Sequence, residues 1–207
     1  MALNILTSAN TPSPTYHVSF AGKTIVTTVT DKADDANAWV NEILLIHYGK
    51  PTIVVGLDIE WRPHYNRNMS NKSATLQLCV DDKCLILQLF YMDYLPQSLK
   101  NFLSDSAAIF VGLEVGNDVA KLRVEYGLNC RRHADIKALA KARWPGRFRR
   151  PGLKDLALEV AGLRMAKPKH VCKSNWENRV LNVYQIEYAC IDAFASYKIG
   201  HKLLVEV

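Results

Sequence analysis

The chain has 207 residues, of which 49% are hydrophobic and 22% are charged. This composition is ordinary for a globular protein with one full core. No apolar run approaches the length of a membrane-spanning helix, and residues 1–20 lack the basic-then-apolar order of a signal peptide. We therefore expect no membrane partner.

The net charge indicates the class of partner, and the cysteine pattern indicates the cellular compartment. The net charge is +6 and the pI is about 9.0, which favours a polyanionic partner, although many basic proteins bind no nucleic acid. The five cysteines are scattered, and no pair has the C-x-x-C spacing of a zinc site. We expect reduced thiols, and hence a cytoplasmic protein, with the nucleus as the alternative location.

The first half of the chain predicts an antiparallel meander. Residues 1–14 are rich in Ser, Thr, Asn and Pro and are expected to form a flexible tail. Runs rich in β-branched and apolar residues predict a hairpin around Ala21-Gly22-Lys23 and further strands around an Asp81-Asp82-Lys83 turn. The expected strands are residues 15–20, 24–30, 52–61, 74–80 and 84–89, and a helix near 31–47 interrupts them.

The second half is mainly helical. A strand is expected at residues 109–113, and Asn182 is expected to cap the last helix. One helix is expected to begin near Pro96. The others are expected to cover residues 117–126, 133–144, 153–161 and 183–205. Strands followed by alternating strand and helices predict an α/β fold, with one mixed sheet and a single domain over residues 15–207.

The central predicted strand ends in two carboxylates. The run from Thr52 to Trp61 is β-branched and apolar, and Asp58 and Glu60 lie one residue apart near its end. Side chains alternate along a strand, so both acids share one face. Two carboxylates on a buried face are unfavourable unless a cation neutralises them. The simpler alternative is that the strand ends there with both acids solvated.

Two later stretches each add a carboxylate. After the strand at 109–113, glycines lead into a helix whose first turn contains Asp118, with Glu114 and Asn117 as competing ligands nearby. The helix dipole alone could account for an acid at this position. Tyr188 and Asp192 lie four residues apart, hence on one face of the last helix. Asp192 is either a functional group in an apolar helix or a solvent-facing acid bonded to Tyr188.

The combination Asp58-x-Glu60, Asp118 and Tyr188-x-x-x-Asp192 resembles the motifs of the DEDDy 3′–5′ exonucleases of the ribonuclease H-like superfamily, in particular the Werner-syndrome exonuclease type. The resemblance extends from about Thr52 to near the C-terminus. It includes residues 54–61, Tyr65-Asn66-Arg67, residues 76–79 and Ser174-Asn175-Trp176. The chain is also similar to small, single-domain plant members of the RISC-interacting clearing 3′–5′ exonuclease type. It departs from the Werner type in lacking Gln-Trp after Asp118.

This resemblance implies a ribonuclease H-like mixed β-sheet with helices on both faces, and a site for two divalent ions. Asp58, Glu60 and Asp192 would hold one ion, and Asp58 would bridge to a second that Asp118 reaches mainly through water. Oxygen ligands suit Mg²⁺ or Mn²⁺, and ions about 4 Å apart could activate a water and stabilise the leaving oxygen. Tyr188 would position that water, since a phenol with a pKa near 10 is a poor base. Without ions, the mutual repulsion of the carboxylates should raise some of their pKa values.

Contacts to the nucleic acid are expected from three places. Trp61, Tyr65, Asn66 and Arg67 follow the first motif, and some of them could stack on or orient the terminal nucleotides. Leu113 could wedge between bases. The same side chains could equally be core or loop anchors. Basic residues gather between residues 131 and 150, and Arg147, Arg149 and Arg150 lie in a glycine-flanked segment expected to form a phosphate track beside the site. The alternative is a solvated helix face and loop.

The expected substrate is single-stranded RNA. Small size and the lack of a helicase domain favour RNA by resemblance, while DNA is the alternative, as in the Werner type. The resemblance to the plant enzymes implies Argonaute partners and a role in RNA silencing. Apolar residues at Phe90, Tyr91, Met92 and Tyr94 predict a homo-oligomer, with a hexamer as one option. An inactive nucleic-acid-binding module on the same fold is the alternative of a different class.

Neutralising Arg147, Arg149 and Arg150 together should weaken RNA binding and flatten its salt dependence. Each phosphate that the variant no longer neutralises reduces the slope of log K against log salt by about 0.7 for a single strand. Fluorescence anisotropy with labelled RNA at several salt concentrations measures both quantities. An unchanged affinity and slope would exclude the phosphate track.

Overall fold

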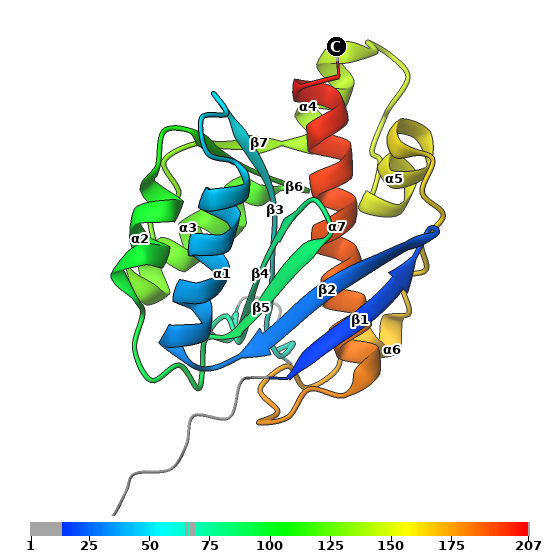
Figure 1. Ribbon diagram of the computed structural model, residues 1–207. Helices are drawn as coiled ribbons and strands as arrows, with labels where there is room; N and C mark the ends of the chain where they lie inside the picture. The colour runs from blue at the N-terminus through cyan, green and yellow to red at the C-terminus, as the bar shows by residue number, and fades with distance from the viewer. Residues whose placement is uncertain (1–13, 65, 67–68, 207) are drawn as a thin grey trace, which may run out of the picture.

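The protein forms a three-layer α/β structure in which a twisted sheet separates two groups of helices (Figure 1). The computed structural model describes residues 14–64, 66 and 69–206, so the tail expected at residues 1–14 lies almost wholly outside the described residues. None of the helices in these ranges is both long and apolar enough to cross a membrane.

The sheet has seven strands in the order β1-β2-β5-β4-β3-β6-β7. The strands are β1 (Thr15–Phe20), β2 (Lys23–Thr30), β3 (Ile53–Glu60), β4 (Thr75–Val80), β5 (Lys83–Gln88), β6 (Ala108–Gly112) and β7 (His133–Asp135). The pairs β1–β2, β5–β4 and β4–β3 are antiparallel, whereas β2–β5, β3–β6 and β6–β7 are parallel. The sheet is therefore mixed, as expected.

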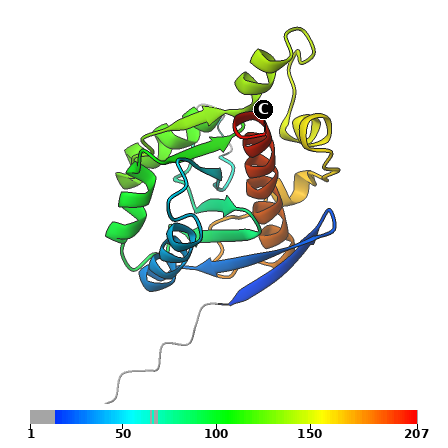
Figure 2. The same cartoon turned by 45° about the horizontal axis from the view of Figure 1, so that its top comes forward.

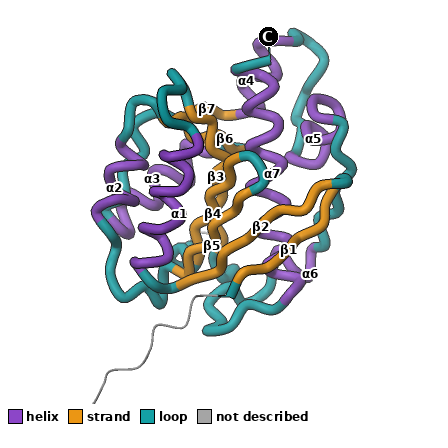
Figure 3. Tube along the Cα trace, viewed as in Figure 1, coloured by secondary structure: helices purple, strands orange, loops and turns teal. Residues whose placement is uncertain are grey.

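The helices cover both faces of this sheet, which Figure 3 shows with the strands between the two groups. The helices are α1 (Ala33–Ile46), α2 (Gln97–Ser104), α3 (Val115–Tyr126), α4 (Ile136–Arg143), α5 (Leu153–Ala161), α6 (Lys169–Cys172) and α7 (Val183–Leu204). One hydrophobic core cluster packs α1, α2 and α3 on one face of the sheet. A second packs α4, α5, α6 and α7 on the opposite face. Figure 2 shows α7 lying along the sheet, so its side chains reach the central strands.

Most of the expected elements are confirmed, but two expectations are wrong. Residues His133–Asp135 form strand β7 and not the first turn of a helix, because Phe110, Val111 and Gly112 of β6 pair with them in parallel. The first half is also not a simple meander. Helix α1 separates β2 from β3, so β2 pairs in parallel with β5 at the far side of β4. The short helix α6 was not expected from the sequence.

A glycine in β3 lets α7 approach the sheet closely. A Cβ atom at Gly56 would lie 2.0 Å from the carbonyl oxygen of Ala193 and 2.7 Å from the backbone nitrogen of Tyr197. Gly56 is two residues before Asp58, so both positions face α7. The backbone contact at Gly56 therefore fixes how near α7 comes to the carboxylates of β3.

Gly56→Ala is expected to destabilise the protein by about 3 kcal/mol or more, because neither backbone atom above the new methyl group can move without shifting α7. Gly116→Ala in α3 is the control, since its nearest neighbour would be 3.8 Å away and alanine favours a helix. Urea unfolding of both variants measures the difference. A loss at Gly56 no larger than at Gly116 would contradict this account of the packing.

Candidate metal and nucleic-acid site

An open cleft of about 460 Å³ lies where β3 ends, between the start of α3 and the segment that leads into α7. Strands β3 and β6 both end at this edge, so the residues after them converge there. Its described lining residues are Asp58, Ile59, Glu60, Trp61, Pro63, Leu113, Glu114, Asn117, Asp118, Lys167, Cys172, Lys173, Tyr188 and Asp192. Figure 1 shows α6 and the start of α7 at this end of the molecule.

Three carboxylates meet in the cleft. One oxygen each from Asp58, Glu60 and Asp192 lies within 4.8 Å of the others. Asp58 and Glu60 share the face of β3 that α7 covers, and Asp192 comes from α7 with only 2% of its surface exposed. The Oδ1 atom of Asp192 is buried and has no hydrogen-bond partner among the described residues. A buried carboxylate oxygen without a partner, on a residue that lies beside two further carboxylates, fits a cation ligand.

Burial raises the pKa values of Asp58, Glu60, Asp118 and Asp192, and neighbouring acids add to the shift at the first three. Burial is the main cause at Asp58, where the nearby Asp192 and Asp118 add to it and the pKa lies well above its usual range. Burial and the charge of Asp58 raise the pKa of Glu60 to about 10. The pKa of Asp118 rises to about 7 through burial and the charge of Glu114. The pKa of Asp192 is also raised by burial, although Lys167 opposes the shift. These shifts match the expectation that the carboxylates repel one another without a cation.

Lys167 makes an ion pair with the carboxylate cluster in the described structure. Its Nζ atom lies 2.5 Å from Oδ2 of Asp192 and 5.4 Å from the centre of the Tyr188 ring. Burial alone would lower the lysine pKa, but the charges of Asp192, Asp58 and Glu60 raise it, so the ammonium form persists. No local sequence signal marks Lys167, because it lies in the connection between α5 and α6, outside the motifs named above.

Tyr188 is held by the segment that precedes α7. Its ring packs against that of Trp176 with centroids 6.0 Å apart, and the indole N–H donates to the carbonyl of Cys172 at 3.2 Å. Burial, and then the charge of Asp192, raise the pKa of Tyr188 above its usual value. Tyr188 therefore stays a neutral phenol, which can donate a hydrogen bond but is a poor general base.

The start of α7 is fixed by reciprocal capping. The Asn182 side chain accepts from the backbone N–H of Gln185 at 3.0 Å, and the Gln185 side chain accepts from the backbone N–H of Asn182 at 3.1 Å. This confirms the expected cap. The Gln185 amide also donates to the Ser174 hydroxyl and the Asn175 carbonyl. The Ser174-Asn175-Trp176 motif thus positions the helix that carries Tyr188 and Asp192.

Asp118 is brought to the cleft by a strained turn between β6 and α3. Glu114 has a left-handed backbone with a φ of 57°, and its N–H donates to Oδ2 of Asp135 at 3.0 Å. The other oxygen of Asp135 caps α4. Gly112 is required just before the turn, because a Cβ there would lie 2.5 Å from the carbonyl oxygen of Leu57. Asp118 lines the same cleft as the three-carboxylate cluster but is not part of it.

The loop after β3 is tied to α3. The backbone N–H and the hydroxyl of Ser73 both donate to Oε2 of Glu125 at 2.8 Å. Lys121 pairs with Glu125, donates to the carbonyl of Asn71 at 2.6 Å and lies 5.4 Å from the centre of the Trp61 ring. These contacts hold both ends of the loop to the helix that carries Asp118.

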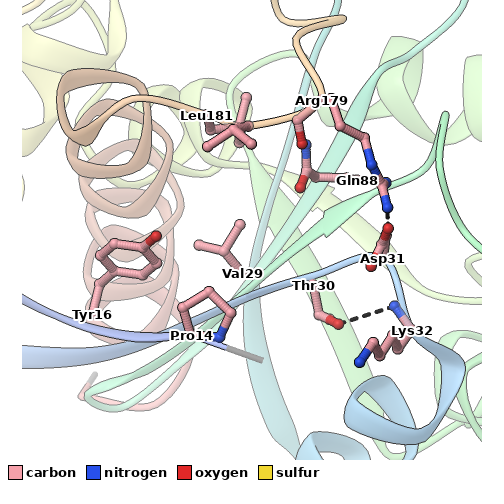
Figure 4. Close-up of a pocket in the computed structure, with 10 residues that line it drawn as sticks. Pro14, Tyr16, Val29, Thr30, Asp31, Lys32, Gln88, Arg179 and Leu181 are labelled. Atoms are coloured by element: carbon pink, nitrogen blue, oxygen red, sulfur yellow. Dashed lines mark hydrogen bonds and ion pairs between the residues drawn. The ribbon is translucent and has the colours of Figure 1, made fainter. Parts of the chain in front are cut away.

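A second hollow lies at the same edge of the sheet, where β2 and β5 end (Figure 4). Arg179 enters it from the segment before α7, pairs with Asp31 and lies 4.7 Å from the centre of the Tyr91 ring. The Gln88 amide donates to the carbonyls of Asn178 and Arg179 at 3.1 and 3.2 Å. These contacts bind the segment before α7 to the sheet, and they therefore help to position the start of α7.

Only some of the other residues expected to contact nucleic acid line the cleft. Trp61 and Leu113 line the cleft, whereas Asn66 is not among its described lining residues and Tyr65 and Arg67 lie outside the described residues. Arg147 pairs with Glu159 at 2.6 Å and faces the Trp144 and Phe148 rings. The segment of Arg147, Arg149 and Arg150 lies near the C-terminal end of α7, away from α6 (Figures 1 and 2).

The apolar and aromatic residues expected at an oligomer interface differ in their exposure. Phe90 and Tyr94 are exposed, but Met92 packs on the core. The Tyr91 hydroxyl donates to the Glu177 carbonyl at 2.5 Å. All five cysteines are free thiols, as expected, and Cys172 alone among them is exposed.

A mixed sheet whose central strand carries two carboxylates beneath a helix carrying a third defines a class of metal-dependent nucleases with a ribonuclease H-like fold. The model of the 3′–5′ exonuclease family matches residues 27–207. The chain belongs to this 3′–5′ exonuclease family.

Two curated relatives agree with this assignment. A 3′–5′ exonuclease of Arabidopsis thaliana is 34% identical over 155 residues, which are 74% of this chain and 53% of that protein. The bifunctional 3′–5′ exonuclease/ATP-dependent helicase WRN of Mus musculus is 30% identical over 157 residues, 72% of this chain and 11% of that protein. The chain thus spans about half the length of the first relative and a small part of the second.

Solved structures show the same fold. Escherichia coli RNase D, an exoribonuclease involved in structured RNA processing, superposes with a TM-score of 0.70 at 18% identity, over 87% of this chain and 44% of that chain. The EXD2 exonuclease domain soaked in Mn and GMP gives a TM-score of 0.50 at 25% identity, over 86% of this chain and 89% of that chain.

The metal-free protein is expected to lose stability as the pH rises from 5 to 8. Each raised carboxyl pKa means that the folded state keeps protons that the unfolded state releases, so the free energy of unfolding falls with pH above about 4. For Asp118 this fall ends near pH 7, and for Glu60 it continues towards pH 10. Asp58→Asn removes one ionisable group and should reduce the fall.

Thermal melting in EDTA at several pH values measures this effect, and the difference between wild type and variant isolates the site from other titrating groups. Asp82→Asn, in the exposed β4–β5 turn, is the matched control and should keep the wild-type slope. Saturating Mn²⁺ should remove most of the fall, because a bound cation offsets the repulsion. Equal slopes for wild type and Asp58→Asn would contradict the shifts.

Proposed function

We propose that this protein is a metal-dependent 3′–5′ exonuclease that shortens single-stranded RNA. The observation that carries the proposal is the convergence of Asp58, Glu60 and Asp192, with a buried oxygen of Asp192 left unpartnered. Membership of the 3′–5′ exonuclease family supplies the reaction class and the direction. Asp118 and Tyr188, the remaining residues expected from the motif, line the same cleft.

The residues present fit a divalent cation. The three ligand atoms are all carboxylate oxygens, which suits Mg²⁺ or Mn²⁺. Asp58, Glu60 and Asp192 would hold one ion, and Asp118 would serve a second ion in the same cleft. When bound, the metal lowers the pKa of a water and neutralises charge on the phosphate oxygens.

The protein's own groups position the substrate for this chemistry. Tyr188 is neutral and directed to the cleft by Trp176, so its hydroxyl can orient the attacking water. Trp61 and Leu113 line the cleft and offer apolar surfaces on which a terminal base can stack. Lys173, which also lines it, supplies a cation for a neighbouring phosphate.

RNA is proposed over DNA on the resemblance to the plant exonucleases. The fold similarity to RNase D is compatible with either nucleic acid. The relation to WRN keeps a 3′–5′ DNA exonuclease as the second candidate. An inactive binding module is disfavoured because all four carboxylates and the tyrosine reach the cleft.

The proposed setting of this activity also comes from resemblance. We propose a cytoplasmic role, with the nucleus as the alternative, in clearing RNA fragments alongside Argonaute proteins. We also propose a homo-oligomer, for which a hexamer is one arrangement. The exposed Phe90 and Tyr94 side chains are candidates for its interface. Light scattering that gave the monomer mass of 23.3 kDa would exclude this assembly.

The direct experiment is a degradation ladder from 5′-labelled single-stranded RNA and, separately, DNA, with Mg²⁺, Mn²⁺ or EDTA. We expect metal-dependent shortening from the 3′ end, faster on RNA than on DNA. Asp58→Ala should lower the rate by at least about 100-fold, the upper limit for losing an outer-shell partner of a metal ligand. Asp82→Ala, an exposed acid outside the cleft, is the matched control and should leave the rate unchanged.

A faster ladder on DNA would select the Werner-type candidate. Intact RNA binding without cleavage under any metal would select the inactive module. Cleavage that persists in Asp58→Ala would show that the carboxylate cluster is not the catalytic site.

A further inference from the structure

Lys167 reaches the carboxylate cluster from outside every sequence motif. It lies between α5 and α6, and one third of its side chain is exposed, on the wall of the cleft. Its Nζ atom is 2.5 Å from Oδ2 of Asp192, so the two groups form a close ion pair. The same ammonium group lies 5.4 Å from the centre of the Tyr188 ring.

The two oxygens of Asp192 have different environments. Oδ2 accepts the hydrogen bond from Lys167, while Oδ1 is buried without a partner among the described residues. A carboxylate rotates about its Cβ–Cγ bond unless a hydrogen bond fixes it. The contact to Lys167 therefore fixes the orientation of the Asp192 carboxylate beside Asp58 and Glu60.

We propose that Lys167 is a positioning residue of the metal site, which holds Oδ2 of Asp192 so that Oδ1 is presented to the cation. This inference rests on the proposed metal-dependent function. Outer-shell partners that orient a metal ligand typically contribute 10-fold to 100-fold to metal affinity. The role of Lys167 is thus to orient a ligand, and it needs no contact with the substrate.

A competing role for Lys167 makes the opposite prediction. An ammonium group that merely neutralises the empty cluster would repel an incoming cation, so its removal would tighten metal binding. A group that orients Asp192 does the reverse, since without it the carboxylate is free to turn. The sign of the change in metal affinity separates the two roles.

The test is isothermal titration of Mn²⁺, without nucleic acid, into wild type, Lys167→Met and Lys167→Arg. We expect Lys167→Met to weaken binding by about 10-fold to 100-fold. Lys167→Arg should stay within a few-fold of wild type, because a guanidinium also donates to a carboxylate. Lys169→Met removes the same charge two residues away, outside the described cleft lining, and should leave the affinity unchanged.

Unchanged or tighter Mn²⁺ binding by Lys167→Met would overturn the positioning role. Weakening by Lys169→Met to the same degree would also overturn it, since general charge would then explain the effect. No Mn²⁺ binding by wild type would instead remove the metal site itself, which distinguishes failure of the proposed function from failure of this inference. A matching far-ultraviolet circular dichroism spectrum and melting temperature show that each variant is folded.

Discussion

The close packing of α7 on β3 is the constraint on which the site depends. Gly56 allows the α7 backbone at Ala193 and Tyr197 to lie where a side chain would otherwise stand. Asp58 lies two residues further along the strand, and Asp192 one residue before Ala193 on the helix. The contact that buries the apolar side chains of the sheet therefore also forces carboxylates together, and their raised pKa values record this unfavourable arrangement.

The rest of the site is built by fixing the segments that lead into these two elements. Reciprocal capping by Asn182 and Gln185 sets where α7 begins, and the Arg179–Asp31 pair holds the preceding segment to the sheet. Across the cleft, Asp135 secures the left-handed turn at Glu114 that leads to Asp118. The four carboxylates are thus carried by regular elements, β3, α3 and α7, while the loop that follows Trp61 is tied to α3 through Lys121 and Glu125.

Lys167 changes how the electrostatics of the cleft are understood. Without a nearby cation, the negative charge of the three clustered carboxylates would depend on a metal ion alone for neutralisation. The lysine offsets part of this repulsion and distinguishes the two oxygens of Asp192. Arg147, one of the basic residues gathered between residues 131 and 150, is placed differently, since it is engaged with Glu159 and with the Trp144 and Phe148 rings. The net charge of the chain therefore says little about charge within the cleft.

The sequence by itself determined the elements and the main catalytic candidates. Alternation placed Asp58 and Glu60 on one face of a buried strand, helical spacing placed Tyr188 with Asp192, and the fold class followed from the order of strands and helices. Only the tertiary structure showed that residues 133–135 form a strand, because β6 supplies the pairing that three residues cannot signal locally. It also brought Lys167 to Asp192 and left Arg147, Arg149 and Arg150 outside the described lining of the cleft, since contacts between distant segments have no periodicity that a sequence can display.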